Sequence, residues 1–284
     1  MDFSPGRDRR LVAVKRGVAA FAVMQVAVVF LVGGEPDGDR ARGSDGQGSG
    51  DRAGASRDVI GHSVHGREIV ARRIGDRAAR RTALVVGSIH GDETQGHRVV
   101  RRLRRHHDRR LDGVEVWTIT TVNPDGVAAG TRKNAHGVDL NRNFGHDFDP
   151  TLSGGYESGP GPFSEPESKA VRALVRRIRP NLTIWYHQPW GVTLVPCNHT
   201  GDVARRYARL SGLPPRDCHP YPPGSATSWQ YHRFGKPAFV VEFPGRRLRQ
   251  SEVRRHARAV AALAERQPGR VDGRRKHRGI HLHW

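Results

Sequence analysis

The chain has 284 residues, which is enough for one α/β domain with a sizeable core and extensions at both ends. Its formal net charge of +20 would suit anionic partners such as nucleic acid, anionic lipid or a cell wall. The excess is almost entirely arginine, however, and no nucleic-acid-binding module or interleaved basic and aromatic pattern is visible. We therefore expect a solvated basic surface and no nucleic-acid partner.

The N-terminal segment has the pattern of an export signal. Basic residues between positions 7 and 16 precede an apolar run over 18–32, which only Gln25 interrupts. The run is shorter than the roughly twenty residues that a membrane-spanning helix needs. We interpret residues 1–34 as a signal peptide, with an uncleaved membrane anchor as the alternative. Either reading predicts a secreted or otherwise extracytoplasmic protein.

Two other segments lack the pattern of a folded domain. Residues 35–56 consist of Gly, Asp, Arg and Ser with almost nothing apolar beyond Ala, which predicts a disordered linker. Residues 267–284 return to Gly, Arg and His and are expected to form a basic, His-containing tail. A single folded domain is therefore predicted for the remaining residues, 57–266.

Strands and helices alternate through this domain, which predicts an α/β fold with helices on both faces of a mixed sheet. The glycine- and proline-rich stretches between them predict turns and loops. In the first half of the domain we expect an edge hairpin over 59–70, a strand at 83–86, a helix at 94–105, a strand at 114–121, a turn at 123–126 and a loop over 145–162. A helix then begins with a capping box at 164–167 and ends before Pro180, and a strand follows at 182–186. The last elements are a helix at 202–211 ended by Pro214 and Pro215, a loop over 220–228, a strand at 238–241, and a helix from its N-cap Ser251 to about Glu265.

Potential metal ligands follow three of these strands. His90 and Glu93 lie in a glycine-containing turn after the strand at 83–86, His187 ends a second strand, and Glu242 ends a third. Open α/β sheets gather their ligands outside the carboxyl ends of strands, so we expect all four groups on one rim. Two His and one Glu can hold zinc and leave a position for water, whose proton Glu242 could accept.

The order and spacing of several motifs resemble the zinc metallocarboxypeptidases of the carboxypeptidase A superfamily. The resemblance extends from about residue 57 to 265 and makes 57–266 the expected catalytic domain. Besides the His and Glu residues above, it rests on Asn-Pro-Asp-Gly at 123–126, Arg-Lys-Asn at 132–134, Gly-Val-Asp-Leu-Asn-Arg-Asn-Phe at 137–144 and Val-Glu-Phe-Pro at 241–244.

The compact length, Gly224-Ser225 followed by Trp229, and the Glu-Phe-Pro motif most resemble the murein peptide amidase A branch, which acts on cell-wall peptides. The resemblance implies an αβα sandwich with a mixed, mostly eight-stranded central sheet of the phosphorylase/hydrolase-like type. It also implies one zinc ion per chain, held by the ligands His90, Glu93 and His187.

Roles for four further residues are implied by the same resemblance. Glu242 matches the position of the general base, and Arg132 matches the arginine that polarises the scissile carbonyl. Asn141 and Arg142 match the pair that grips the terminal carboxylate of the substrate, for which a planar guanidinium is well suited. Many relatives also place a mobile tyrosine before the catalytic Glu, and we assign no such role to Tyr231.

The chain has two cysteines, Cys197 and Cys218, and neither lies in a Cys-x-x-Cys zinc pattern. In an exported protein they could form one disulfide, which would stabilise the fold by roughly 3 kcal/mol in the chain-entropy model. Two free thiols are the alternative.

The function implied by the resemblance is that of a zinc metallopeptidase that cleaves the γ-D-glutamyl–diaminopimelate bond of murein peptides. The expected partner is a peptide with a free terminal carboxylate, and we expect a monomer. Three alternatives stay open at this point. They are an ordinary metallocarboxypeptidase acting on L-peptides, an acyl-amino-acid deacylase, and a wall-binding module with an inactive site.

Overall fold

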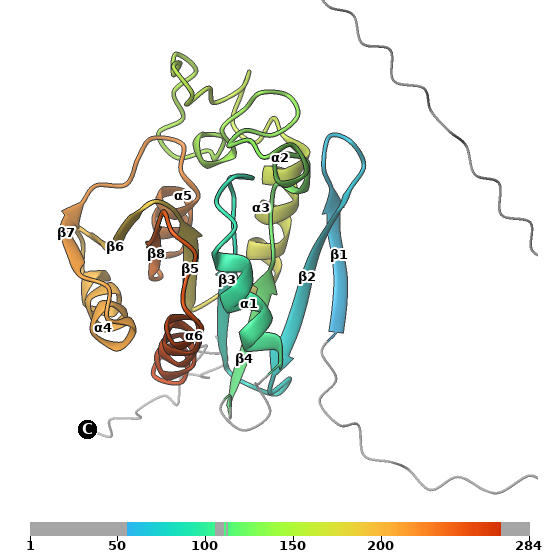
Figure 1. The fold of residues 1–284 in the computed structure, drawn as a ribbon. Coiled ribbons are helices and arrows are strands. Elements are labelled where there is room, and N and C mark those ends of the chain that lie inside the picture. Colours follow the sequence, from blue (N-terminus) through green and yellow to red (C-terminus); the bar gives the residue numbers. More distant parts are fainter. Residues whose placement is uncertain (1–55, 106–110, 112, 268–284) are drawn as a thin grey trace, which may run out of the picture. The chain divides into compact units, whose positions relative to one another are not determined.

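The computed structural model describes residues 56–105, 111 and 113–267, which form a mixed sheet of eight strands covered by helices (Figure 1). The expected sandwich architecture is thereby confirmed. The predicted signal peptide or anchor, nearly all of the linker and nearly all of the tail lie outside the described residues. The strands are β1 (Ser56–His62), β2 (Glu68–Gly75), β3 (Arg81–Val86), β4 (Val114–Ile119), β5 (Leu182–His187), β6 (Trp190–Pro196), β7 (Pro215–His219) and β8 (Ala238–Pro244).

The strands lie in the order β1-β2-β4-β3-β5-β8-β6-β7. The four central strands, β4, β3, β5 and β8, are parallel. Both faces of this part of the sheet are covered, which explains the uninterrupted apolar runs of β3 and β5. Because the four strands point the same way, their carboxyl ends open at one edge of the sheet, where the expected site residues follow.

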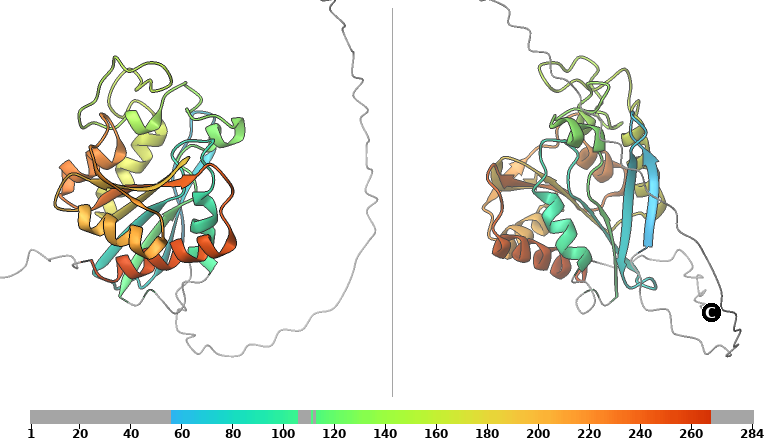
Figure 2. Two further views of the ribbon diagram at one scale, coloured as in Figure 1. Left: turned by 60° about the vertical axis from the view of Figure 1, so that its left-hand side comes forward. Right: turned by 45° about the vertical axis from the view of Figure 1, so that its right-hand side comes forward.

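Helices cover the two faces of the sheet, as the views in Figure 2 show. On one face, Val100, Tyr207 and Val260 join three helices to one apolar core. On the other face, Leu174 and Trp229 join two helices to a second core. The first face carries α1 (Gly96–Arg105), α4 (Gly201–Ser211) and α6 (Gln250–Ala264), and the second face carries α3 (Pro166–Ile178) and α5 (Ala226–Phe234). Two short helices, α2 (Pro124–Ala129) and η1 (Leu140–Arg142), lie in the loops. Among the described residues no helix combines the length and apolarity needed to cross a bilayer.

Besides the short helices α2 and η1, three elements occur where the sequence predicted none: β6, β7 and α5. β7 is a five-residue, mostly exposed edge strand without an apolar run, so it lacks the pattern by which strands are predicted. α5 buries five residues in succession, from Ala226 to Gln230, and therefore lacks a helical alternation of buried and exposed positions. The expected loop over 220–228 ends instead at Ser225, whose hydroxyl accepts a hydrogen bond from the Ser228 N–H and caps α5.

The predicted capping box at 164–167 is wrong. The N-cap of α3 is Glu165, and its side chain makes no capping hydrogen bond. The Glu167 carboxylate instead accepts hydrogen bonds from the Val64 N–H at 3.1 Å and from the Asn134 amide at 3.1 Å. Partners from distant parts of the chain thus outcompete the local pairing that the sequence suggests. Pro166 remains the first helical residue, as its fixed φ favours.

The last helix also begins earlier than expected. Its N-cap is Arg249 rather than Ser251, and the Arg249 N–H donates to the Glu252 carboxylate at 2.6 Å. The helix expected at 202–211, α4, ends at its C-cap Gly212, which has the left-handed conformation. It therefore stops before Pro214 and Pro215, the residues that were expected to end it. The edge hairpin is present and is longer than predicted, because β1 and β2 together span 56–75.

Candidate metal centre and active site

The loop after β3 is held against the loop after β4 by two glycines. A side chain at Gly91 would lie 2.0 Å from the carbonyl carbon of Gly126, so only glycine permits this approach. Gly126 in turn donates its N–H to the Asn123 side chain at 2.8 Å, which makes the expected turn at 123–126 the first turn of α2. This packing fixes the turn that carries His90 and Glu93.

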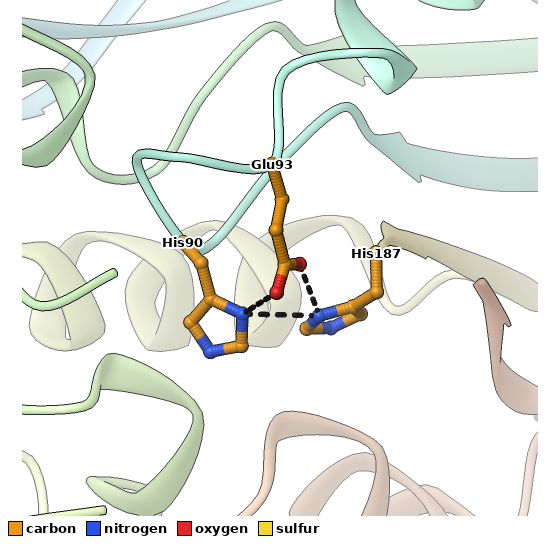
Figure 3. A group of neighbouring side chains, drawn as sticks. All are labelled: His90, Glu93 and His187. Atoms are coloured by element: carbon orange, nitrogen blue, oxygen red, sulfur yellow. Dashed lines mark hydrogen bonds and ion pairs between the residues drawn. The ribbon is translucent and has the colours of Figure 1, made fainter. Parts of the chain in front are cut away.

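His90, Glu93 and His187 converge at the carboxyl edge of the sheet, as Figure 3 shows. The Nδ1 atoms of the two imidazoles are 3.2 Å apart. One Glu93 oxygen lies 2.9 Å from His90 Nδ1 and the other lies 2.8 Å from His187 Nδ1. All three side chains are buried. The structure thus brings together the three residues that the sequence proposed as metal ligands.

The donor set and its spacing fit a zinc ion. Two ligands bound at about 2.0–2.1 Å to a tetrahedral ion lie about 3.3–3.4 Å apart, close to the separation of the two Nδ1 atoms. Three Lewis bases buried this close favour a positive charge beside them, which Arg132 supplies in part at 3.1 Å from His90 Nδ1 and which a bound metal ion would complete. Burial opposes the charge of Glu93, but the two imidazoles outweigh burial and hold its pKa well below the usual range. The carboxylate is therefore ionised and able to bind a cation.

Asp139 anchors both His90 and Arg132. Its Oδ1 atom lies 3.0 Å from His90 Nε2, and Oδ2 accepts two hydrogen bonds from the Arg132 guanidinium at 3.1 and 2.9 Å. Burial alone would lower the pKa of His90, but the hydrogen bonds with Asp139 and Glu93 raise it above the ordinary value. A carboxylate behind a histidine fixes the ring orientation and makes the opposite nitrogen a better ligand. Asp139 lies in the 137–144 motif, but no role for it was predicted from the sequence.

Glu242 lies beside the metal-site residues because β8 pairs with β5 and places it opposite His187. Its side chain is buried, and its Oε2 atom has no hydrogen-bond partner among the described residues. Burial, and the nearby negative charge of Glu93, raise the pKa of Glu242 to about 7. A carboxyl group with this pKa can exchange a proton near neutrality.

Two arginines and a tyrosine complete the wall of the site. The Arg132 and Arg142 guanidinium carbons lie 5.4 and 5.2 Å from the centre of the Tyr156 ring. Arg132 also donates to Glu93 at 3.2 Å, which places it beside the metal-site residues. Asn141 accepts the Ala226 N–H through its side-chain oxygen at 3.0 Å, so its amide nitrogen is directed away from this contact. The expected catalytic and carboxylate-binding residues thus lie together.

The zinc carboxypeptidase family matches residues 54–257, a stretch that includes every site residue described above. The chain belongs to the zinc carboxypeptidase family. The shared segment covers more than half of the chain and begins and ends close to the predicted catalytic domain.

Individual relatives agree with the resemblance to the murein peptide amidase A branch. Murein peptide amidase A of Escherichia coli strain K12 is 38% identical over 100 residues, covering 31% of this chain and 37% of the relative. Murein peptide amidase A of Vibrio campbellii is 29% identical over 164 residues, covering 53% of this chain and 64% of the relative. In both cases the match spans less than two thirds of the relative. Both names, like the family, indicate a hydrolase.

Solved structures share the fold over most of the domain. The murein-tripeptide amidase from Escherichia coli O157 has a TM-score of 0.59 and 26% identity, covering 77% of this chain and 95% of that chain. Bovine thrombin-activatable fibrinolysis inhibitor has a TM-score of 0.64 and 20% identity, covering 74% of this chain and 89% of that chain. The second comparison supports the fold alone.

A cavity of about 240 Å³ opens in front of the metal centre of this zinc carboxypeptidase family member. It extends from the metal-site residues to β6, β7 and β8. Of these three strands the sequence missed β6 and β7, which contribute Trp190, Leu194, Pro196 and His219 to the wall. Tyr231 does not line it and instead contacts His199. The lining residues that sequence reasoning did not identify as part of the site are Tyr156, Gln188, Pro189, Trp190, Leu194, Pro196, His219, Tyr221, Pro222, Thr227, Phe239 and Val240.

Cys197 and Cys218 form a disulfide between the ends of β6 and β7. Of the two alternatives, a disulfide or two free thiols, the structure therefore shows the disulfide. Pro196, which precedes Cys197, and His219, which follows Cys218, both line the catalytic cavity. The disulfide therefore ties together two neighbouring parts of the cavity wall.

Proposed function

We propose that the chain is a zinc-dependent peptidase that releases the C-terminal residue of a peptide, and that its substrate is a murein peptide cleaved at the γ-D-glutamyl–diaminopimelate bond. The observation that carries the proposal is the meeting of His90, Glu93 and His187 with buried Glu242 and two guanidinium groups in one cavity. The names of the relatives support the choice of bond. We also propose export, supported by the apolar segment at 18–32.

The terminal carboxylate of the substrate would bind to Arg142 and Asn141. Arg142 is half-buried, and burial lowers its pKa without removing its charge, so it offers a cation in a partly desolvated place. Its Nη1 atom donates to the Asn141 carbonyl at 2.8 Å, which leaves the other guanidinium nitrogens for a carboxylate. The Asn141 amide nitrogen adds a second donor. Together they would place the scissile bond at a fixed distance from the chain end.

Glu242 and Arg132 would act on the scissile bond. Glu242 would accept a proton from the attacking water and then transfer it to the departing amine. Arg132, held by Asp139, would donate to the oxygen that becomes negative as the carbonyl is attacked. A zinc ion held by the three ligands would supply Lewis-acid chemistry that lowers the pKa of water to about 7.

One observation favours a second candidate, an ordinary metallocarboxypeptidase that removes apolar L-residues. Leu194, Pro196, Phe239 and Val240 give the cavity apolar walls, and none of these side chains could pair with the charged end of diaminopimelate. His219, on the same cavity wall, is the group that such a charged end could contact.

A substrate panel tests both candidates. Purified enzyme with measured zinc content is given L-alanyl-γ-D-glutamyl-meso-diaminopimelate, N-blocked L-dipeptides ending in Leu or Phe, and the amidated form of each. The proposal expects release of diaminopimelate with a kcat/KM at least about a hundredfold above that for the dipeptides, and little cleavage of the amides. Preferred cleavage of the dipeptides would establish the second candidate instead. Zinc-loaded enzyme that cleaves none of them would refute both.

A further inference from the structure

A second pocket lies on the α3 and α5 side of the sheet, apart from the catalytic cavity. It has a volume of about 500 Å³ and shares no lining residue with the catalytic cavity. α5 contributes Thr227 to the catalytic cavity and Trp229 to this second pocket, so the helix separates the two. The proposed peptidase activity makes no use of this pocket. It is lined by Gly145, Pro162, Phe163, Arg172, Arg176, Trp229 and Arg233.

Three of the lining residues are arginines, and none of the three forms an ion pair with a carboxylate among the described residues. Arg172 and Arg176 lie one turn apart on the same side of α3, and Arg233 comes from α5. The neighbouring Arg177, by contrast, is paired with Asp58. No acidic residue lines the pocket. Arg172 is half-buried and Arg176 and Arg233 are exposed, so water and salt screen part of their mutual repulsion, and an anion bound among them would be attracted by all three charges.

The apolar wall of the pocket is a fixed structure. Phe163 has a φ of 57°, in the left-handed region that bulky residues rarely adopt, and its N–H is held by the Asn143 carbonyl at 2.6 Å. A side chain at Gly145 would approach the Phe163 ring to 2.8 Å, so the glycine makes room for the ring. Phe163 and Trp229 meet edge to face with their centres 5.4 Å apart.

The two parts of the pocket are in contact with each other. The Arg172 guanidinium carbon lies 4.7 Å from the centre of the Phe163 ring, so a charged group and an aromatic wall adjoin within one cavity. Guanidinium groups bind phosphate oxygens in pairs, and several of them suit a dianion better than a single carboxylate. An aromatic wall next to the cations suits a ring or another apolar group attached to that anion.

We propose that this pocket is a binding site for an organic phosphate, with the phosphate among Arg172, Arg176 and Arg233 and its ring or apolar part against Phe163 and Trp229. Phenyl phosphate carries both features and serves as the probe. Inorganic phosphate lacks the ring, and benzoate keeps the ring but replaces the phosphate by a carboxylate.

Isothermal titration of the zinc-loaded enzyme at low ionic strength tests the site. Phenyl phosphate is expected to bind once per chain, at least about tenfold more tightly than inorganic phosphate or benzoate. The double substitution Arg172→Gln and Arg176→Gln is expected to weaken this binding at least about tenfold while leaving peptide hydrolysis and the melting temperature unchanged. Arg254→Gln, an exposed position on α6, is the matched control and is expected to bind as the wild type does.

Because Arg142 could also attract the probe, Arg142→Ala is titrated in parallel and is expected to retain phenyl phosphate binding. Loss of binding in Arg142→Ala with retention in the double variant would place the anion in the catalytic cavity and overturn the proposal. So would the absence of saturable binding, or benzoate binding as tightly as phenyl phosphate.

Discussion

Replacing Asp139 by Asn should weaken zinc binding without altering any of the three proposed ligands. The Asp139 side chain is fully buried, and both of its oxygens act as hydrogen-bond acceptors. The donors are His90, Arg132 and the Asn141 N–H. Asn has the same size, but its amide nitrogen must face one of these donors. Loss of one such bond to a charged group costs about 1.5–3 kcal/mol, which corresponds to an affinity for zinc about 10- to 160-fold weaker.

The dissociation constant for zinc is measured by competition with a chromophoric chelator, for the wild type, Asp139→Asn and the surface control Asp217→Asn. Asp217 is an exposed carboxylate paired with Arg205, so its loss should leave the affinity for zinc unchanged. Circular dichroism of the metal-free proteins checks that each variant is folded. A folded Asp139→Asn protein that binds zinc as tightly as the wild type would show that Asp139 does not support His90 as a ligand.

Four further outcomes are expected. Glu242→Gln should lower kcat at least about a hundredfold with zinc content unchanged, as measured by steady-state kinetics and metal analysis; near-normal turnover would remove Glu242 from the mechanism. Arg142→Ala should raise KM for substrates with a free terminal carboxylate, and Arg142→Lys should rescue only partly because an ammonium cannot reproduce the guanidinium fork; a wild-type ratio of free to amidated substrate cleavage would contradict this. Cys197→Ser with Cys218→Ser should lower the free energy of unfolding by about 3 kcal/mol in urea titrations, since the disulfide closes a loop with a sequence separation of 21; equal midpoints and slopes would argue against it. Burial lowers the pKa of His256 to about 4, below the ordinary value of about 6.5, so the unfolded chain binds a proton at this histidine before the folded protein does. The folded state should therefore lose up to about 3 kcal/mol of stability as the pH falls from about 6.5 to about 4. His256→Gln should flatten the pH dependence of unfolding, and an unchanged slope would contradict the assignment.

The proposed metal ligands could be found from the sequence because each lies at the end of a strand or in the turn that follows it. The apolar runs of β3, β5 and β8 are unambiguous, and the parallel arrangement brings their carboxyl ends to one edge. His187 and Glu242 then become neighbours through strand register alone. Prediction succeeded here because a short-range pattern and one topological rule decide the positions.

Tyr156 and Asp139 were missed for a different physical reason. Tyr156 lies in the loop expected over 145–162, near the mouth of the site, and nothing in that loop's composition indicates which of its residues reaches the site. Its position is set by a hydrogen bond from the Asp139 N–H to the carbonyl of Glu157 at 2.7 Å, which returns the loop to the site. Asp139 acquires its role only when β3 and the 137–144 segment meet. Contacts between distant segments leave no periodic pattern in a sequence.

The surroundings of three buried carboxylates favour a division of roles among them. Glu93 touches two imidazoles and Arg132, and Asp139 touches His90 and Arg132. Interactions with the two imidazoles hold the pKa of Glu93 well below the usual range, and interactions with His90 and Arg132 do the same for Asp139. These two carboxyl groups are suited to holding a cation and cannot accept a proton near neutrality. Glu242 forms no ion pair among the described residues, and burial raises its pKa to about 7. Carboxyl groups whose pKa values are pushed apart in one site commonly take different roles, and we propose that the proton-accepting role here falls to Glu242.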